Sequence, residues 1–351
     1  MLIARRVIFY WIFKIIDAEM EFSPLMANEI ELAKGIFVVS IDFELAWGYV
    51  DEKLTAEKKA AIRREAEAII RLLNLFDEYN IPATWGVVGH LLENDCVWSG
   101  GRAHADFPRP IMADEKRDWF AAHPAPSDPE EDLWFDRCGL VDAIRQARAG
   151  HEIASHSYAH LLYGSKQSHP RALEKDLAKA ASIHQARGLA CSTFIFPRNS
   201  VGQLDLLQKY GFACYRGRRT HWYDPLPRPL GRLAHLASYL SPIGLTSAPA
   251  IGRNGLVDIP DSLLLMSRGG VRRHLPPACV ARKARNSLAR AAARQEIFHL
   301  WFHPYNLVFE TERQFAILRS VFQAAARLRG AGKIDILTMK DAARKVRGNC
   351  L

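Results

Sequence analysis

The feature that most constrains the fold of this 351-residue chain is a recurring alternation of short apolar runs with amphipathic segments. The first run, residues 35–42, is almost continuously apolar and ends in polar residues, which is typical of a strand buried on both faces of a parallel sheet. Residues 55–79 then place alanine, isoleucine and leucine at helical spacing, and residues 81–88 form a second strand-like run. Strand, helix and strand in succession predict a βα repeat.

The same alternation continues toward the end of the chain. We expect further strands at residues 151–155, 191–196, 212–215, 256–259, 296–302 and 334–337, and further helices at residues 138–149, 171–187, 202–210, 277–295 and 311–328. Two stretches interrupt the repeat: residues 95–137, with several tryptophans and prolines and an acidic cluster, and residues 218–255, which are rich in proline and arginine and are expected to be irregular. A parallel barrel with insertions near these two stretches is the architecture that the pattern favours.

The composition is that of a large folded domain. Hydrophobic residues make up 49% of the chain and charged residues 24%, which excludes disordered and collagen-like classes. The six cysteines have no CxxC or framework spacing, and this favours reduced thiols in a cytoplasmic compartment. We expect residues 36–345 to form one barrel, preceded by an extension of residues 1–35.

The chain is basic, with 47 lysines and arginines against 38 aspartates and glutamates and a net charge of +9. It contains no zinc-finger, RNA-recognition or basic-heptad pattern, so we expect no nucleic-acid partner. Solvated helix faces with a bias toward anionic small molecules or anionic lipid surfaces explain the charge better.

Residues 1–16 carry two arginines and an apolar run that is too short to span a bilayer. No small-residue cleavage site follows, as it would in a signal peptide. Three interpretations remain open: a membrane-surface anchor, a helix packed on the body, or sequence upstream of a true start at Met26. With no export signal evident, we expect a cytoplasmic protein, with a position at the inner face of the membrane as an alternative.

The strongest local signal is the pair His156 and His160, which follows the predicted strand 151–155. On a helical turn, a spacing of four residues places both imidazoles on one face, within reach of one cation. Parallel barrels carry their active sites at the carboxyl ends of the strands, where this pair would lie. Among thirteen histidines such a pair also arises by chance, and two surface or core histidines are the alternative.

Asp42 and Glu44 form a second signal at the end of the first predicted strand. Buried carboxylates are costly unless they are paired, so a metal or a basic partner is expected; a helix cap or a solvated turn is the alternative. Together with the histidine pair, one carboxylate would complete a two-histidine, one-carboxylate metal site with open positions for water and substrate. The other carboxylate would remain as a general base.

His303 closes the predicted strand 296–302 and forms the third signal. A histidine suits a general acid, because its unperturbed pKa lies near the working pH. For a single residue, a hydrogen-bonded core histidine is the alternative. His299, inside the strand, is expected to be structural.

Three segments, in this order, resemble motifs of the polysaccharide deacetylase (NodB-homology, carbohydrate esterase family 4) superfamily: SIDFE at 40–44, GHEIASHSYAH at 150–160 and WFHPYN at 301–306. Residues 81–92, IPATWGVVGHLL, also resemble the second strand of these proteins. The resemblance covers nearly the whole chain apart from the N-terminal extension. It implies an α/β fold, a distorted (β/α)7-type parallel barrel with loop insertions.

The resemblance further implies a hydrolase that removes an N-acyl group, such as acetyl, from an amino-sugar unit of a surface polysaccharide or its precursor. Asp42 would then be the catalytic base and His303 the catalytic acid. The implied ligands of a divalent metal ion, with Zn²⁺ expected, are Glu44, His156 and His160.

The third motif departs from the family pattern, in which an arginine stands two residues before a proline. Here Ile195 has that position, and Arg198 follows Pro197 instead. We expect Arg198 to reach Asp42 from the other side. A backbone N–H near residues 197–199 is expected to stabilise the oxyanion.

The fourth region, residues 256–261, lacks a clean match to the family's aspartate and tryptophan. Asp258 or Asp261 is expected to orient His303, with Asp258 as our choice for the site. These departures leave the predicted metal site intact and affect the substrate class.

The expected substrate-binding residues are Trp47, Trp85, Asn199 and Tyr305. The two tryptophans are candidates for stacking on sugar rings, with burial in the core as the alternative. The expected partner is an N-acylated saccharide, either a cytoplasmic precursor or a lipid-linked glycan at the membrane. Two alternatives remain: an amidohydrolase or deformylase acting on a small non-sugar amide, and an inactive saccharide-binding barrel.

Overall fold

The computed structural model describes residues 30–108, 118–166 and 168–348. Its strands are β1 (Gly35–Phe43), β2 (Thr84–Val87), β3 (Trp98–Ser99), β4 (Arg102–Ala103), β5 (Glu152–Ser155), β6 (Thr193–Ile195), β7 (Cys214–Arg216), β8 (Ala250–Ile251), β9 (Val257–Asp258), β10 (Leu263–Leu264), β11 (Ile297–Phe302) and β12 (Ile334–Ile336). Its α-helices are α2 (Ala56–Arg63), α3 (Glu65–Tyr79), α4 (Leu140–Gln146), α5 (Pro170–Ala186), α6 (Leu204–Lys209), α7 (Arg228–Ser238), α8 (Pro277–Arg294), α9 (Thr311–Gly330) and α10 (Met339–Gly348). Short 3-10 helices are η1 (Leu45–Tyr49), η2 (Gly89–Leu92), η3 (Glu131–Trp134), η4 (Pro197–Asn199), η5 (Gly270–His274) and η6 (Pro304–Leu307).

The main sheet has the strand order β10-β11-β1-β2-β5-β6-β7-β9-β8, and β12 pairs with the beginning of β1. Neighbouring strands are parallel except for β8 and β9. β9 and β10 belong to one segment, residues 257–264, which pairs with β7 at its beginning and with β11 at its end. Between them, the N–H of Asp261 donates to the carbonyl of Gly217, and that of Ser262 donates to His299. The sheet therefore curls back on itself, and the predicted (β/α)7-type barrel is confirmed.

The alternation of side chains along the strands determines the interior of the barrel. Ile36 and Val38 of β1 join an inner apolar cluster with residues of β5, β6, β7, β9 and β11, whereas Phe37 packs in the larger outer cluster. The next inward positions of β1, Ser40 and Asp42, are polar, yet they are only 0% and 2% exposed. The interior thus changes from apolar at the amino ends of the strands to polar at their carboxyl ends.

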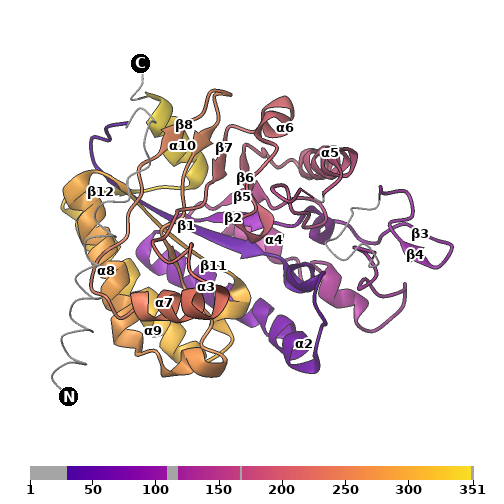
Figure 1. Cartoon of the computed structure of the whole chain (residues 1–351), viewed down its shortest axis with the longest axis horizontal. Coiled ribbons are helices and arrows are strands. Elements are labelled where there is room, and N and C mark those ends of the chain that lie inside the picture. The colour runs from indigo at the N-terminus through magenta and orange to yellow at the C-terminus, as the bar shows by residue number, and fades with distance from the viewer. Residues whose placement is uncertain (1–29, 109–117, 167, 349–351) are drawn as a thin grey trace.

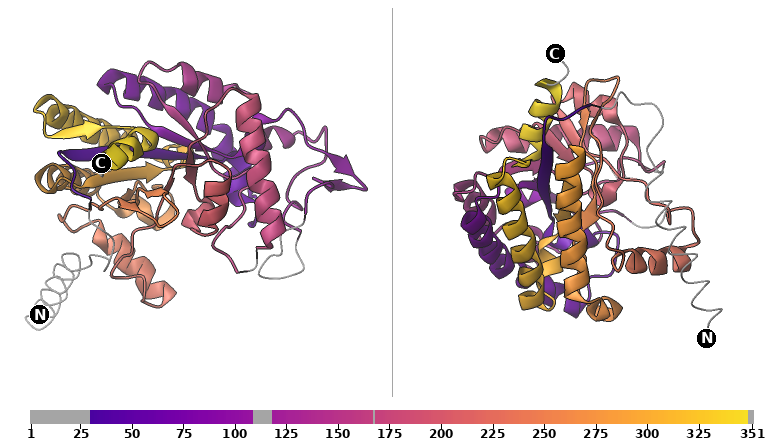
Figure 2. Two further views of the ribbon diagram at one scale, coloured as in Figure 1. Left: turned by 90° about the horizontal axis from the view of Figure 1, so that it is seen from above. Right: turned by 90° about the vertical axis from the view of Figure 1, so that its left-hand side faces the viewer.

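Helix α10 adds apolar side chains to the inner cluster. Met339, Ala342 and Val346 pack there, and the N–H of Met339 donates to the hydroxyl of Thr84 over 2.8 Å. Helices α8 and α9 lie side by side along β1, β11 and β12 (Figures 1 and 2). Because the amino-end half of the interior is filled in this way, a ligand can meet polar interior groups at the carboxyl ends of the strands.

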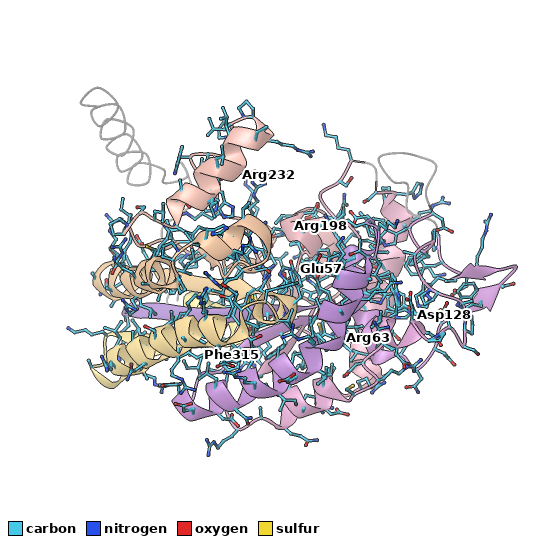
Figure 3. The ribbon with its side chains drawn as sticks, turned by 90° about the horizontal axis from the view of Figure 1, so that it is seen from below. Glu57, Arg63, Asp128, Arg198, Arg232 and Phe315 are labelled. Atoms are coloured by element: carbon cyan, nitrogen blue, oxygen red, sulfur yellow. The ribbon has the colours of Figure 1, made fainter. Side chains whose placement is uncertain are left out.

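Three helical segments differ from the sequence prediction. The predicted helix 55–79 is divided at Arg64 into α2 and α3; Figure 3 labels Glu57 and Arg63 of α2. Residues 218–255, predicted to be irregular, contain helix α7, and α10 was not predicted. The proline of α7 stands in its first turn, where a missing N–H costs nothing, so proline there does not exclude a helix.

The insertion at residues 95–137 is anchored to the barrel by two buried indoles. Trp119 donates its indole N–H to the carbonyl of Ala159 over 2.9 Å, and Trp47 donates to the carbonyl of Trp134 over 3.2 Å. The hairpin β3–β4 projects from the body of the molecule (Figures 1 and 2). The insertion is therefore held beside the loops that follow β1 and β5.

Residues 1–29 lie outside the described residues, and with them most of the N-terminal extension and its three interpretations. In the part of the chain that the structure describes, each helix is either too short or too polar to cross a bilayer.

Candidate active site

Glu44, His156 and His160 converge at the carboxyl ends of the barrel strands. Oε1 of Glu44 lies 2.9 Å from Nε2 of His156 and 3.1 Å from Nε2 of His160. The three residues are 6%, 0% and 1% exposed, respectively. Glu44 follows β1 and the histidines follow β5, so the set joins segments that are distant in the sequence.

The two histidines lie in a loop and not on the helical turn that their spacing suggested. In this loop, Ser157 and His160 have positive φ angles of 69° and 58°. The carboxylate of Asp176 on α5 accepts hydrogen bonds from the hydroxyl of Ser157 (2.7 Å) and from the N–H groups of Tyr158 (3.0 Å) and Ala159 (2.8 Å). A buried carboxylate from a neighbouring helix, rather than helical spacing, brings the imidazoles together.

The donor atoms of this set fit a divalent cation. Nδ1 of His156 donates to the carbonyl of Ile195 over 2.9 Å, which leaves Nε2 as the ring nitrogen that faces Glu44. Two imidazoles and a carboxylate offer ligand atoms that all lie within 4.8 Å of one another. Two histidines and one carboxylate form a donor set used for Zn²⁺ and for other transition metals.

The charges of the set favour the protonation states that metal ligands need. Burial alone would raise the pKa of Glu44, but the charges of His303 and His160 and hydrogen bonds from His156 and His160 hold it well below its usual value. Burial lowers the pKa of His160 below its usual value. An ionised carboxylate and a neutral imidazole can both bind a metal without first losing a proton.

Asp42 forms a bidentate ion pair with Arg216, the last residue of β7. The two guanidinium–carboxylate contacts are 2.6 and 2.7 Å long, and both residues are buried. Burial tends to raise the pKa of Asp42, but Arg216 outweighs this effect and the pKa is lowered. The guanidinium also lies 4.4 Å from the ring centre of Trp301, which fixes its orientation further.

Arg198, which was expected to reach Asp42, has other partners. Its guanidinium lies 2.5 Å from Oδ1 of Asp51 and 3.4 Å from Oε1 of Glu52. Arg198 has a positive φ of 53° in η4, and its side chain contacts these acidic residues after η1 instead of the barrel interior. Sequence reasoning missed Arg216, although residues 212–216 place it at an inward position of a strand, two residues after the buried cysteine.

Asn199 lies beside this ion pair. Its side-chain oxygen accepts hydrogen bonds from Nε (3.2 Å) and Nη2 (2.8 Å) of Arg216. Its side-chain nitrogen donates to Oδ2 of Asp261 over 3.2 Å. Asn199, expected to bind substrate, therefore positions Arg216, and its remaining surface borders the site.

His303 lies close to the carboxylates of Asp42 and Glu44. Its Nε2 is 3.4 Å from Oε1 of Glu44 and 3.7 Å from Oδ2 of Asp42. Burial lowers the pKa of His303, but the two carboxylates outweigh burial and raise it to about 9. The side-chain oxygen of Asn306 accepts a hydrogen bond from the backbone N–H of His303 (2.8 Å) and lies 3.3 Å from its Nδ1.

The two aspartates that were expected to orient His303 have other contacts. Asp258 lies against Gly217, where an added Cβ would come within 1.9 Å of its Oδ1. Asp261 accepts a hydrogen bond from the N–H of Arg219 over 2.7 Å. The orienting contact of His303 therefore comes from Asn306, three residues later in its own loop, and not from Asp258.

The burial of Trp47 and Trp85 contradicts the prediction that they stack on sugar rings. Trp47 and Trp85 are both 0% exposed. Trp47 packs against the rings of His90 (4.6 Å between centres) and Trp134 (5.0 Å), and Trp85 lies in the core on β2. Neither has a surface on which a sugar ring could stack, whereas Trp301, which was not singled out, borders the site.

Two adjoining cavities open at the site. A cavity of about 210 Å³ is lined by residues that include Asp42, Glu44, His160, His303 and Tyr305. A larger cavity of about 540 Å³ shares Asn199 and Trp301 with it and is otherwise lined mainly by residues 218–245 and 261–264. Tyr305 thus lines the smaller cavity next to His303, and its role in substrate binding stays a prediction.

The sequence matches no protein-family model and no curated protein. Among solved structures, the chain is similar to a Mycobacterium smegmatis protein assigned as a polysaccharide deacetylase, with a TM-score of 0.58 at 17% identity, covering 94% of this chain and 95% of the other. A Pseudomonas aeruginosa PAO1 protein assigned likewise has a TM-score of 0.55 at 12% identity, covering 88% and 90%. Puue allantoinase has a TM-score of 0.56 at 12% identity, covering 88% and 89%. The chain therefore has the fold that the sequence motifs implied.

Proposed function

We propose that this chain is a metal-dependent hydrolase of the polysaccharide deacetylase superfamily that removes an N-acyl group from an amino sugar. The observation that carries the proposal is the meeting of three parts at one end of the barrel: a metal donor set, the Asp42–Arg216 pair and His303. The shared fold with proteins assigned as polysaccharide deacetylases supports it.

Glu44, His156 and His160 would hold the cation, for which we propose Zn²⁺. When bound, the ion would supply a Lewis acid that lowers the pKa of a water molecule and polarises the acyl carbonyl. Gly48 leaves room for the carboxylate of Glu44, because a Cβ there would lie 2.2 Å from Oε2.

Asp42 and His303 would move the protons of the reaction. Asp42 stays ionised because Arg216 lowers its pKa, so it can accept a proton from the attacking water. Water adds to the acyl carbon, the C–N bond breaks, and His303 donates a proton to the departing nitrogen. The products are an amine and a carboxylate. The neighbouring carboxylates raise the pKa of His303, which supports its role as the proton donor to the leaving nitrogen.

The oxyanion would be stabilised in part by the loop that follows β6. Pro197 has no N–H, and the N–H of Asn199 already donates to the carbonyl of Phe196 over 2.9 Å. We therefore assign the N–H of Arg198 to this role within residues 197–199.

The lining of the larger cavity supports an anionic substrate. Arg218, Arg219, Arg228 and Arg232 all contribute to its lining, together with only two acidic residues. A positive lining attracts and retains negatively charged ligands. We propose a saccharide that carries a phosphate or another anionic group next to its N-acyl unit.

Helix α7, which lines this cavity, also has the composition of a membrane-contacting helix. Leu230 and Leu233 are 55% and 64% exposed, and Arg228 and Arg232 lie on the same helix. Figure 3 labels Arg232 on α7 at the periphery of the molecule. Exposed leucines beside arginines favour an anionic lipid surface. We propose that α7 contacts the inner face of the membrane and that the substrate is a lipid-linked glycan precursor.

Hydrolysis of a small non-sugar amide is the second candidate. One structure with the same fold is named an allantoinase, and the smaller cavity, about 210 Å³, has room for a compact amide. The size and charge of the adjoining cavity favour the sugar substrate over this candidate.

The test measures amine and carboxylate release from N-acetylated oligosaccharides, from an N-acetylated sugar phosphate and from allantoin. We expect release from the sugars, at least a hundredfold loss in Asp42→Asn and in His156→Ala, and normal activity in the control Asp142→Asn on α4. Turnover of allantoin alone would favour the second candidate. Absence of turnover with all three substrates, in protein loaded with Zn²⁺, would contradict the proposal.

A further inference from the structure

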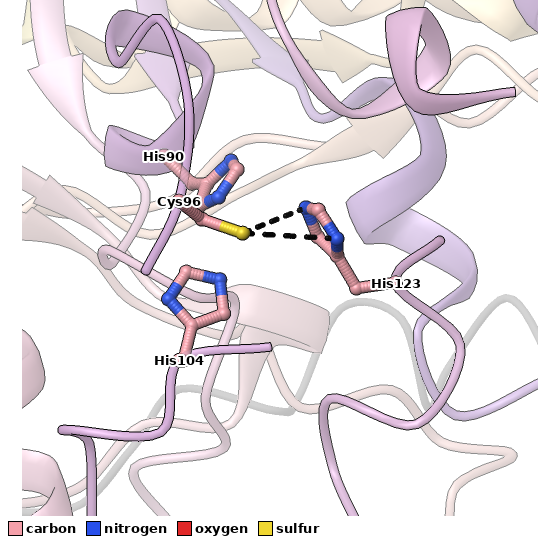
Figure 4. Close-up of side chains that lie close together, drawn as sticks. All are labelled: His90, Cys96, His104 and His123. Carbon is pink, nitrogen blue, oxygen red and sulfur yellow. Dashed lines mark hydrogen bonds between the residues drawn. The ribbon is translucent and has the colours of Figure 1, made fainter. Parts of the chain in front are cut away.

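A second group of potential metal ligands lies apart from the active site, where the 95–137 insertion meets the barrel. The side chains of His90, Cys96, His104 and His123 each offer a ligand atom, and these four atoms all lie within 4.8 Å of one another. Figure 4 shows three imidazole rings gathered around the sulfur of Cys96. Sγ of Cys96 is 3.8 Å from Nε2 of His123. The four residues are six, eight and nineteen positions apart, a spacing that matches no common zinc motif, so the sequence alone did not connect them.

In two of these histidines, Nδ1 already makes a hydrogen bond to a backbone carbonyl. Nδ1 of His90 donates to the carbonyl of Trp134 over 3.1 Å, and Nδ1 of His123 donates to the carbonyl of Pro124 over 3.0 Å. Histidines that bind metals nearly always donate their other N–H in this manner, which fixes the tautomer and the ring orientation. For both residues, this leaves the lone pair of Nε2 as the metal-binding atom.

His90 supplies an independent indication of a missing ligand. It is 0% exposed, and within the described structure its Nε2 has no hydrogen-bond partner. A buried polar atom without a partner is rare in folded proteins. A metal ion would satisfy this atom.

The third histidine also has a polar contact away from the cluster. Nδ1 of His104 lies 3.5 Å from the hydroxyl of Tyr158, which in turn donates to Glu93 and accepts from Lys179. The phenol is thus available as an acceptor for the N–H of His104. The same type of outer contact therefore surrounds three of the four ligands.

We propose that His90, Cys96, His104 and His123 bind one Zn²⁺ ion in a structural site that fixes the 95–137 insertion to the barrel.

The donor chemistry favours this ion. A thiolate with three imidazoles is a soft, nitrogen-rich set that suits tetrahedral Zn²⁺. Zinc–ligand bonds of about 2.0–2.3 Å place tetrahedral ligand atoms about 3.3–3.7 Å apart, close to the observed 3.8 Å between Cys96 and His123. Binding would form one Zn–S and three Zn–N bonds, and the thiol proton would pass to solvent.

Four protein ligands fill a tetrahedral shell, so this site would leave no position for substrate. The surrounding side chains are aromatic. The ring centres of Trp47 and Phe135 each lie 4.6 Å from that of His90, and the ring centre of Phe120 lies 4.6 Å from that of His104. A closed, dry shell is typical of structural zinc sites.

The position of the site gives it a role in the architecture. His90 lies in η2, directly after β2, while the other three ligands lie in the insertion. Trp47, which contacts the ring of His90 at 4.6 Å, is only three residues after Glu44 of the active site. The ion would therefore stabilise both the insertion and the loop that carries Glu44.

Cobalt substitution of the full-length protein tests the proposal, because of the two proposed metal sites this one alone includes a cysteine. We expect one equivalent of Co²⁺ to give a thiolate-to-metal charge-transfer band in the near ultraviolet. The band should disappear in Cys96→Ser and His90→Ala and persist in Cys138→Ser, whose cysteine is exposed. It should also persist in His156→Ala, since the active-site donor set contains no sulfur.

A wild-type protein that is saturated with Co²⁺ and shows no thiolate band would overturn the proposal even if a variant fails to fold. A folded His156→Ala variant that binds no metal would overturn it too. Persistence of the band in folded Cys96→Ser would overturn it as well. Since the readout is a spectrum, it does not depend on deacetylase activity, and either proposal can fail without the other.

Discussion

The ion pair between Asp42 and Arg216 is the residue-level interaction on which the proposed chemistry depends. Both side chains are buried, and each oxygen of the carboxylate receives one guanidinium N–H. Two further acceptors of Arg216, Ser40 and Asn199, leave the guanidinium little freedom. The carboxylate is therefore both ionised and fixed in position, as a general base must be.

Removal of the arginine should destabilise the protein strongly. Arg216→Met leaves the buried carboxylate of Asp42 without its partner, and we expect the free energy of unfolding to fall by about 3–5 kcal/mol. Arg198→Met, which breaks a partly exposed pair with Asp51, should cost less than about 1 kcal/mol. Urea unfolding of the two variants measures the difference. Equal, small losses would show that Asp42 does not depend on Arg216.

At this scale, the sequence indicated the residues that belong to local motifs and missed those that tertiary structure supplies. Asp42 and His303 were singled out because each stands at the end of an apolar strand. Arg216 and Asn306 were missed because their roles depend on which strands and loops become neighbours. Trp47 was assigned to substrate because its burial depends on the insertion, whose packing has no local signature.

Among the elements, the loop after β5 depends most on a partner outside itself. Asp176 of α5 accepts hydrogen bonds from Ser157, Tyr158, Ala159 and the hydroxyl of Tyr163 (2.8 Å). These bonds hold the loop in a conformation with two positive φ angles, in which both ligand histidines face Glu44.

We expect Asp176→Asn to weaken metal binding at Glu44, His156 and His160 by about 10–100-fold, the usual effect of losing an outer-shell contact. Competition with a colorimetric chelator, in a Cys96→Ser background to exclude the second site, measures the affinity. Asp142→Asn on α4 is the control. Unchanged affinity in folded Asp176→Asn would contradict this account of the loop.

Helix α7 provides the second prediction at the scale of elements. The variant Leu230→Asp/Leu233→Asp should reduce binding to anionic phospholipid vesicles about tenfold or more, because inserting one leucine contributes about 1.5 kcal/mol or more. Vesicle co-sedimentation measures binding, and Val97→Asp, at an exposed position of the insertion, is the control. Equal binding by the variant and the wild type would exclude α7 as the contact.

At the scale of the whole molecule, stability should depend on pH through histidines that are buried in the neutral form. Nδ1 of His151 accepts a hydrogen bond from the N–H of Ala83 over 3.0 Å, and burial lowers the pKa of His151 to about 4. In the unfolded chain the pKa is about 6.5, so between these values only the unfolded state takes up the proton. The free energy of unfolding should therefore fall as the pH falls from about 6.5 to about 4.

His151→Asn removes this titrating group and keeps an acceptor near the N–H of Ala83. We expect the decline in unfolding free energy over this pH range to become shallower by up to about 1.4 kcal/mol per pH unit. Urea unfolding across the range measures the slope, with exposed His274→Asn as the control. An identical slope in His151→Asn and the wild type would contradict the prediction.

The architecture was accessible from the sequence because the βα alternation is periodic and the strands are continuously apolar. The sequence pattern could not show how residues 257–264 bridge β7 and β11, because the two halves of this segment pair with different strands. Helix α7 was missed for a related reason: its proline and arginines resemble a loop, and two of its three leucines remain exposed.

The central claim is that the carboxyl end of this barrel holds a catalytic metal ion. Anomalous diffraction from crystals of the full-length protein grown with Zn²⁺ tests it most directly. We predict a peak within about 2.0–2.2 Å of an oxygen of Glu44 and of Nε2 of His156 and of His160. Crystals that contain zinc elsewhere, with no peak between these three side chains, would contradict the account.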